Sequence, residues 1–222
     1  KQILFLYPEI KKSLQINSNL KMPDLTKEPY TAEDFDEKRR IGENDSYICS
    51  LIRSDSIEEF ITYVNRTNYP LKSEIEESIF ETNSYILHHE VTLIEYAFFF
   101  GSIQIVKYLH LSGVEIDSKS WLFAIHGRNP ELIYFLGENN IKAPENDFDI
   151  CFYESIESHH NELALYIQTN YLNDQENQRK KLESFGINTY SNCLKCHNYE
   201  LLPDEFFSSY FVKHNSKSPY ID

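Results

Sequence analysis

Residues 92–109 read TLIEYAFFFGSIQIVKYL, and this stretch decides the fold. The small residue Ala97 stands in an apolar run, and Gly101 follows it four positions later. Apolar residues then return at the i, i+1, i+4 spacing of one helix face, at Ile105, Val106 and Leu109. Glycine supplies the positive φ that a tight turn needs. The stretch therefore predicts two short helices joined by a turn.

The same pattern recurs along the chain. Residues 51–63, 124–136 and 155–167 each carry a small or apolar residue, a turn position four residues later, and apolar residues beyond it. A period of roughly 30 residues is typical of solenoids built from helix pairs, in which each pair buries its apolar face against its neighbours. We therefore expect an all-α fold, a helix-pair solenoid with about four repeats.

Residues 92–113 resemble an ankyrin repeat, whose pattern is T-P-L-H-x-A-A-x-x-G-H-x-x-I-V-x-x-L-L-x-x-G. Leu93 and Glu95 stand where that pattern has Pro and His. The chain is also similar to a family of protist ankyrin-like proteins classed as a domain of unknown function. The resemblance implies an ankyrin-like solenoid with shortened inter-repeat hairpins that binds a protein partner, with neither catalytic activity nor a cofactor. The residues that carry it are Thr92, Ala97, Gly101, Ile105, Val106, Leu109 and Gly113 for the repeat, and 41–52, 92–96, 121–125 and 154–161 for the protist family.

Three parts are expected along the chain. Residues 1–40 would form an N-terminal capping helix and a connector that is extended over 22–36, and 41–171 the repeats. Residues 172–222 would form a C-terminal helical segment, which could begin a further repeat. An insertion at 65–90 is too long for an ordinary repeat loop and would hold either an inserted helix or an irregular hairpin. The expected helices are 3–19, 46–53, 57–66, 73–81, 92–100, 104–112, 119–126, 130–139, 150–157, 161–170, 174–185, 189–197 and 204–213.

The composition limits the classes of partner that the chain could bind. The net charge is −14 and the pI is near 5.0, so most of the surface would repel a nucleic-acid backbone or an anionic membrane. No apolar run is long enough to span a bilayer, so we expect no membrane insertion. The four cysteines are scattered rather than arranged as a secreted disulfide framework, which favours an intracellular, cytoplasmic location.

The inner helices of the expected repeats would offer a groove to a protein partner. By alignment with the ankyrin unit, this groove would have an aromatic centre and an acidic end, as protein interfaces often combine anchors with a polar rim. The alternative is that the shortened hairpins and the 65–90 insertion cover these aromatic residues and make them core. The groove candidates are Tyr96, Phe99, Phe100, Phe123, His126, Glu154 and Glu157, with Ser50 and Arg53 before them.

A second function class rests on Cys193-Leu-Lys-Cys196-His197. This spacing matches half of a zinc site or a haem attachment motif, so the alternative is a metal-stabilised helical domain or a small enzyme centred on Cys193, Cys196 and His197. A fourth zinc ligand is needed, and His214 is the nearby candidate. Buried free cysteines on a helix face are the simpler interpretation.

Other signs of catalysis are weak. The pairs His88-His89 and His159-His160 fit turn-capping or solvent-facing positions, and neither G-x-S-x-G nor HExxH occurs. We therefore expect a protein–protein interaction module and no enzyme, with no metal and no cofactor.

Overall fold

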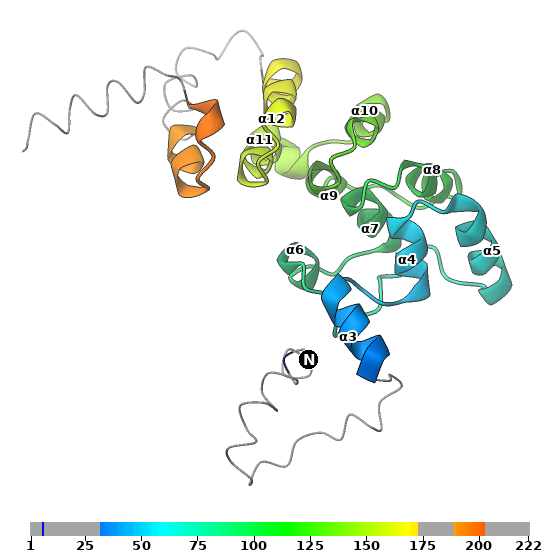
Figure 1. Cartoon of the computed structure of the whole chain (residues 1–222). Helices are drawn as coiled ribbons and strands as arrows, with labels where there is room; N and C mark the ends of the chain where they lie inside the picture. Colours follow the sequence, from blue (N-terminus) through cyan, green and yellow to red (C-terminus); the bar gives the residue numbers. More distant parts are fainter. Residues whose placement is uncertain (1–5, 7–31, 173–188, 203–222) are drawn as a thin grey trace, which may run out of the picture. The chain divides into compact units, whose positions relative to one another are not determined.

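The computed structural model describes residues 6, 32–172 and 189–202, and within them it is helical with no strand (Figure 1). The expectation of an all-α fold is confirmed for this part of the chain. The contacts divide the chain into two compact units, residues 1–115 and 116–222. Each unit is described by itself.

The first unit contains two helix pairs, α4 (Tyr47–Arg53) with α5 (Ile57–Thr67) and α7 (Leu93–Phe99) with α8 (Ile103–Leu111). We call the first helix of each pair the inner helix and the second the outer helix. The two helices of each pair pack against each other, and the pairs also contact each other through α4 with α7 and through α5 with α8 (Figure 1). Ala97 is fully buried in α7, as the close approach of inner helices requires. The helices of this unit are α3 (Ala32–Ile41), α4 (Tyr47–Arg53), α5 (Ile57–Thr67), α6 (Ser84–Leu87), α7 (Leu93–Phe99) and α8 (Ile103–Leu111).

The second unit repeats this arrangement. The inner helices α9 and α11 contact each other, and each packs against the outer helix that follows it. A further helix spans 189–195. The named elements are α9 (Ser120–His126), α10 (Pro130–Glu138), the 3-10 turn η2 (Pro144–Asn146), α11 (Phe148–Glu157), α12 (Asn161–Ile167), the π-helical turn η3 (Gln168–Leu172) and the 3-10 turn η4 (Tyr199–Leu201).

The turn after each inner helix has one geometry. Its key residue has positive φ in every case: Asp55 (48°), Gly101 (75°), Arg128 (52°), His159 (58°) and His197 (58°). In four of these turns the next backbone N–H returns to the carbonyl five residues earlier, as Ser102 N does to Ala97 O at 2.9 Å and Asn198 N to Cys193 O at 2.8 Å. This is the Schellman ending of a helix. The first four turns were predicted from the repeat, and His197 extends the series.

A polar side chain beside the turn links neighbouring helix pairs. Ser102 Oγ donates to Ile52 O at 2.5 Å in the first unit, and Asn198 Nδ2 donates to Ile156 O at 2.9 Å in the second. In both cases the donor directly follows the turn residue, and the acceptor lies three positions before the turn residue of the preceding pair. The residues around 193–202 therefore stack on α11 and α12 as one pair stacks on another.

Helix α7 begins with a capping box. Thr92 Oγ1 accepts from Glu95 N, and the Glu95 carboxylate accepts from Thr92 N at 2.8 Å. Glu95 stands where the ankyrin pattern has His, so this helix start is satisfied by the Thr-x-x-Glu sequence instead.

The predicted helix 73–81 is wrong. Residues 73–75 instead pair with 91–93, since Ile75 N donates to Val91 O at 2.8 Å and Leu93 N to Ser73 O at 3.1 Å. Between these residues the chain holds only the one-turn helix α6. The insertion therefore combines both interpretations: its ends pair as an irregular hairpin, and it holds one short inserted helix, α6.

The predicted extended connector ends earlier than residue 36, because α3 already begins at Ala32. Phe35 is buried and meets Phe80 edge-to-face at 5.3 Å, and Lys38 Nζ lies 2.9 Å from Asp45 Oδ2. These contacts fasten α3 to the unit. The predicted helices 3–19, 174–185 and 204–213 lie outside the described residues, apart from Leu6, which is exposed.

Candidate binding surfaces

The predicted aromatic groove is largely core. Tyr96, Phe99 and Phe123 are buried, and Phe100 is half-buried. Tyr85, from the 65–90 hairpin, stacks on Phe99 with a centroid separation of 6.0 Å. Helix α7 is buried along its whole length and the hairpin covers part of it, and Phe123 is buried in α9. At these three positions the alternative interpretation, that the aromatics are core, is therefore the observed one.

Arg53 organises the polar residues beside these aromatics. Its Nε lies 2.6 Å from a Glu43 carboxylate oxygen, and Nη1 donates to Asn44 O at 2.7 Å and to Tyr96 Oη at 2.9 Å. Its guanidinium also lies 5.9 Å from the centre of the Phe100 ring. Burial raises the pKa of Tyr96 well above its usual value. The cluster is satisfied internally, and Ser50 Oγ donates to the carbonyl of its own helix three residues back.

The remaining groove candidates lie in the second unit. His126 Nε2 on α9 lies 2.9 Å from Glu154 Oε1 on α11, and both side chains are about one-fifth exposed. Glu157 is exposed at the end of α11. The structure therefore joins His126 with Glu154, and binding of a partner at these positions and at Phe100 stays a prediction.

The Cys-x-x-Cys-His motif occupies the last of the repeated turns. Cys193 is fully buried at the position equivalent to Ala97, and His197 is the left-handed turn residue, with Nδ1 2.8 Å from Tyr199 Oη. Burial raises the pKa of both the Cys193 and Cys196 thiols, which disfavours the thiolate that binds metals. No three His, Cys, Asp or Glu side chains of the described residues are grouped to hold a metal. His214 lies outside those residues.

Cys196 is half-buried, and the other two cysteines, Cys49 and Cys151, are buried like Cys193. Burial raises the pKa of Cys49 to about 11 and that of Cys151 to about 12. The histidine pairs have structural contacts: His88 Nδ1 and His89 Nδ1 each lie within 2.7 Å of a carbonyl four residues earlier in the chain.

A groove of about 700 Å³ runs between the outer helices α10 and α12. Its apolar lining comes from Ala124, Ile133 and Leu163. Two tyrosines, one from each helix, also line it and remain open to solvent: Tyr134 is 60% exposed and Tyr166 39%. Neither tyrosine is among the site residues predicted from the sequence. One signal in the sequence could have indicated them. On each outer helix a tyrosine stands next to a buried isoleucine, Tyr134 beside Ile133 and Tyr166 beside Ile167, and therefore points away from the core.

The Tyr166 side of the groove is supported by an aromatic cluster. Tyr171, in η3, lies 6.2 Å from Tyr166, stacks on Phe148 at 4.2 Å and meets Trp121 at 5.5 Å. Burial raises the pKa of Tyr171 to about 12. Gly137 on α10 leaves room for this ring, because a Cβ there would lie 2.6 Å from Tyr171 Oη. The wall is therefore pre-formed by packing.

Polar groups line the start of both helices. Arg128 Nε donates to His160 Nε2 at 3.3 Å, and Asn161 Nδ2 donates to Glu200 Oε2 at 2.6 Å. Desolvation, followed by the Arg128 charge, lowers the pKa of His160. Arg128 has a positive φ of 52°, a conformation more typical of Asn, Asp or Gly.

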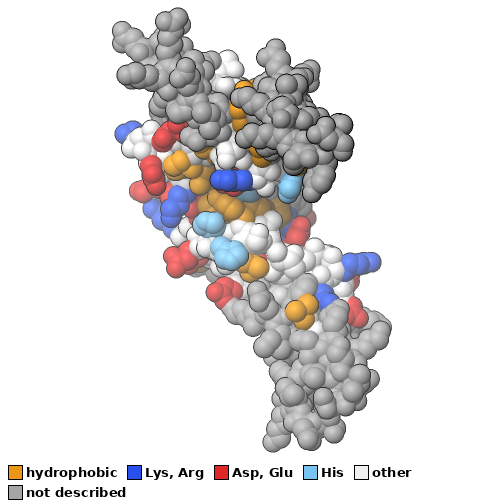
Figure 2. All heavy atoms as spheres, turned by 90° about the vertical axis from the view of Figure 1, so that its left-hand side faces the viewer, with side chains coloured by type: hydrophobic (Ala, Val, Ile, Leu, Met, Phe, Trp, Pro, Cys, Tyr) orange, Lys and Arg blue, Asp and Glu red, His pale blue; other side chains and the backbone are white. Residues whose placement is uncertain are grey.

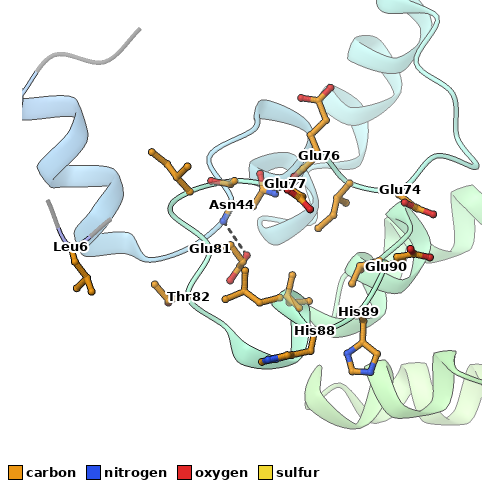
Figure 3. A pocket seen from close by; sticks show the side chains of 16 residues that line it. Leu6, Asn44, Glu74, Glu76, Glu77, Glu81, Thr82, His88, His89 and Glu90 are labelled. Carbon is orange, nitrogen blue, oxygen red and sulfur yellow. Dashed lines mark hydrogen bonds between the residues drawn. The ribbon is translucent and has the colours of Figure 1, made fainter. Parts of the chain in front are cut away.

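A second hollow, of about 580 Å³, lies in the first unit under the 65–90 hairpin. Figure 3 shows glutamates around it, with Glu81 accepting a hydrogen bond from Asn44 N at 3.1 Å. Glu81 also accepts from Asn83 N, and burial raises its pKa. Its carboxylate is thus used to hold the hairpin.

The face of the molecule drawn in Figure 2 has mixed charge. On the face drawn in Figure 2, Lys and Arg side chains of the described residues are interspersed with Asp and Glu rather than gathered into one basic patch. Within the described part of the chain, no helix is both long and apolar enough to cross a membrane.

Comparison with known proteins identifies no relative: no family model, no curated protein and no solved structure matches the chain.

Proposed function

We propose that the chain is a protein–protein interaction module, an ankyrin-like solenoid of helix pairs that binds its partner and has no catalytic activity of its own. The observation that carries this proposal is the groove between α10 and α12, with two solvent-open tyrosines over an apolar floor. Tyrosine anchors in a pre-formed groove are typical of the residues that dominate binding energy at protein interfaces.

The ankyrin-like arrangement is part of the proposal. It is supported by the recurring Schellman turns and by the equivalent links from Ser102 to Ile52 and from Asn198 to Ile156. Such a stack buries each pair against the next and leaves its side faces for recognition. We place the module inside the cell, since its cysteines are free and buried for the most part.

The absence of catalysis is supported by how the reactive groups are used. The thiols of Cys49, Cys151 and Cys193 are buried with raised pKa values, whereas a nucleophilic cysteine has a lowered one. His126 is paired with Glu154, and His160 accepts from Arg128.

Partner capture with matched variants tests the proposal. The parent chain, Tyr134→Ala/Tyr166→Ala and the control Tyr47→Ala, which removes another exposed tyrosine from the first unit, would be used as bait and the retained proteins compared by mass spectrometry. We expect a protein that the parent and the control retain and that the double variant loses. The same retained proteins on all three baits would contradict the proposal, provided that circular dichroism shows equal folding.

A further inference from the structure

We propose that the groove between α10 and α12 binds a basic peptide segment, one in which Lys or Arg side chains flank an apolar side chain. This inference rests on the proposed function and names the chemistry of the partner.

The apolar floor selects the central residue of the segment. Ile133 is buried in α10 yet lines the groove together with Leu163 of α12 and Ala124 of α9. An aliphatic or aromatic side chain placed here would lose its contact with water between two tyrosine rings. Because Tyr171 supports the Tyr166 ring, little rearrangement is needed for this contact.

The carboxylates on and beside the groove favour a positively charged ligand. Helices α10 and α12 carry Glu131, Glu138 and Glu162 and neither Lys nor Arg, and Glu200 lies on the groove lining. Tyrosine rings attract cations through their π faces, and carboxylates next to them add a counter-charge. Glu138 also forms a side-chain hydrogen bond with Tyr134, which raises the pKa of that phenol.

Arg128 gives the groove a direction. It is the one Lys or Arg among the described lining residues, and it lies before the start of α10, away from the two tyrosines in the next turns of the helices. Its Nε is held by His160, which leaves the other N–H groups of the guanidinium to donate to carbonyl groups of a bound segment. Lysine or arginine of the segment would therefore lie toward Tyr134 and Tyr166.

The whole chain supports this choice over other occupants. A net charge of −14 attracts a basic partner at long range and repels an acidic segment or a second copy of the same chain.

The test is selection from a random heptapeptide phage library on the full chain, followed by fluorescence anisotropy with the selected peptides. Two groove variants are compared with the parent: Tyr134→Ala/Tyr166→Ala and Glu162→Gln/Glu200→Gln. The control Glu58→Gln/Glu59→Gln removes the same charge from the exposed side of α5.

We expect selected peptides to combine Lys or Arg with an apolar residue. The tyrosine variant should weaken binding by about tenfold or more. The groove carboxylate variant should weaken it by about two- to fivefold per carboxylate at low salt, the control should bind like the parent, and added salt should remove the difference.

Selected peptides without an excess of Lys or Arg that still require the tyrosines would overturn the basic partner and leave the proposed function standing. Peptides that bind the tyrosine variant as well as the parent, or no selection above empty beads, would overturn the groove as a binding site, and the proposed function with it.

Discussion

Replacing Asp55 tests how neighbouring helix pairs are held together. Asp55 is the left-handed turn residue after α4, and its carboxylate accepts from Gln104 N at 3.1 Å and from Ile105 N at 3.0 Å. It therefore caps the first turn of α8, which belongs to the next pair. The residue has two separable roles, one in the turn and one in the cap.

Three substitutions separate these roles. Asp55→Asn keeps an acceptor oxygen and tolerates positive φ, so it should cost less than about 1 kcal/mol. Asp55→Gly removes the cap, which costs about 1 kcal/mol, but it also removes a β-carbon from a left-handed position, which offsets part of that loss. Asp55→Ala removes the cap and keeps the left-handed β-carbon that the parent already carries, without the local hydrogen bonding by which aspartate tolerates this conformation. The expected loss is about 1–2 kcal/mol for alanine and about 0.5–1 kcal/mol for glycine.

Urea unfolding followed by circular dichroism measures these differences, with the slope of the transition checked for constancy. The expected order of stability is parent, Asn, Gly, Ala. Equal stability of the Gly and Ala variants would refute the role of the turn conformation. If all three variants matched the parent, the carboxylate would not be capping α8.

Three further predictions concern packing. Ala97→Leu should overpack the contact between α4 and α7 and cost about 1–3 kcal/mol, and an unchanged thermal melt would contradict the inner-helix contact. Gly137→Ala should lower the free energy of unfolding by about 1–2 kcal/mol in spite of its gain in helix propensity, because the new β-carbon meets Tyr171 Oη. Urea unfolding followed by tryptophan fluorescence measures this difference. A variant more stable than the parent would show that the Tyr171 ring moves aside at little cost. Cys193→Ser/Cys196→Ser should retain helicity with modestly lower stability, and a chelator that unfolds the parent would instead revive the zinc interpretation.

The helix pairs could be predicted because their signals are local. The spacing of Ile105, Val106 and Leu109 and the turn four residues after Ala97 depend only on neighbours in sequence, and the observed helices α7 and α8 begin and end within one residue of the predicted ranges. The turn itself was predictable at Asp55 although no glycine stands there.

The 65–90 segment was not predictable in the same way. Its conformation depends on Ile75 meeting the Val91 backbone and on Phe80 reaching Phe35, contacts between residues 16 and 45 positions apart that no local pattern encodes. The wrong prediction of a helix over 73–81 also affects the predicted groove, because Tyr85 from the same 65–90 segment helps to cover Phe99.

The groove between α10 and α12 was missed for a related reason. An exposed tyrosine on an amphipathic helix is unremarkable in sequence, and only the placement of α10 and α12 on either side of one groove brings Tyr134 and Tyr166 to the same hollow. The left-handed turn at Arg128 itself was predicted, because the repeat aligns this position with Asp55, Gly101 and His159.

The links between helix pairs have a consequence for how such a chain changes over evolutionary time. Ser102 and Asn198 donate to backbone carbonyls, and every residue type at positions 52 and 156 supplies the same acceptor. For this hydrogen bond only the donor position is constrained in composition, and any apolar residue that suits the buried positions of Ile52 and Ile156 keeps the acceptor. A helix pair that is duplicated, lost or exchanged keeps its junction without a matching change in its neighbour. Length can therefore vary by whole pairs, while the side chains on the outer helices diverge toward new partners.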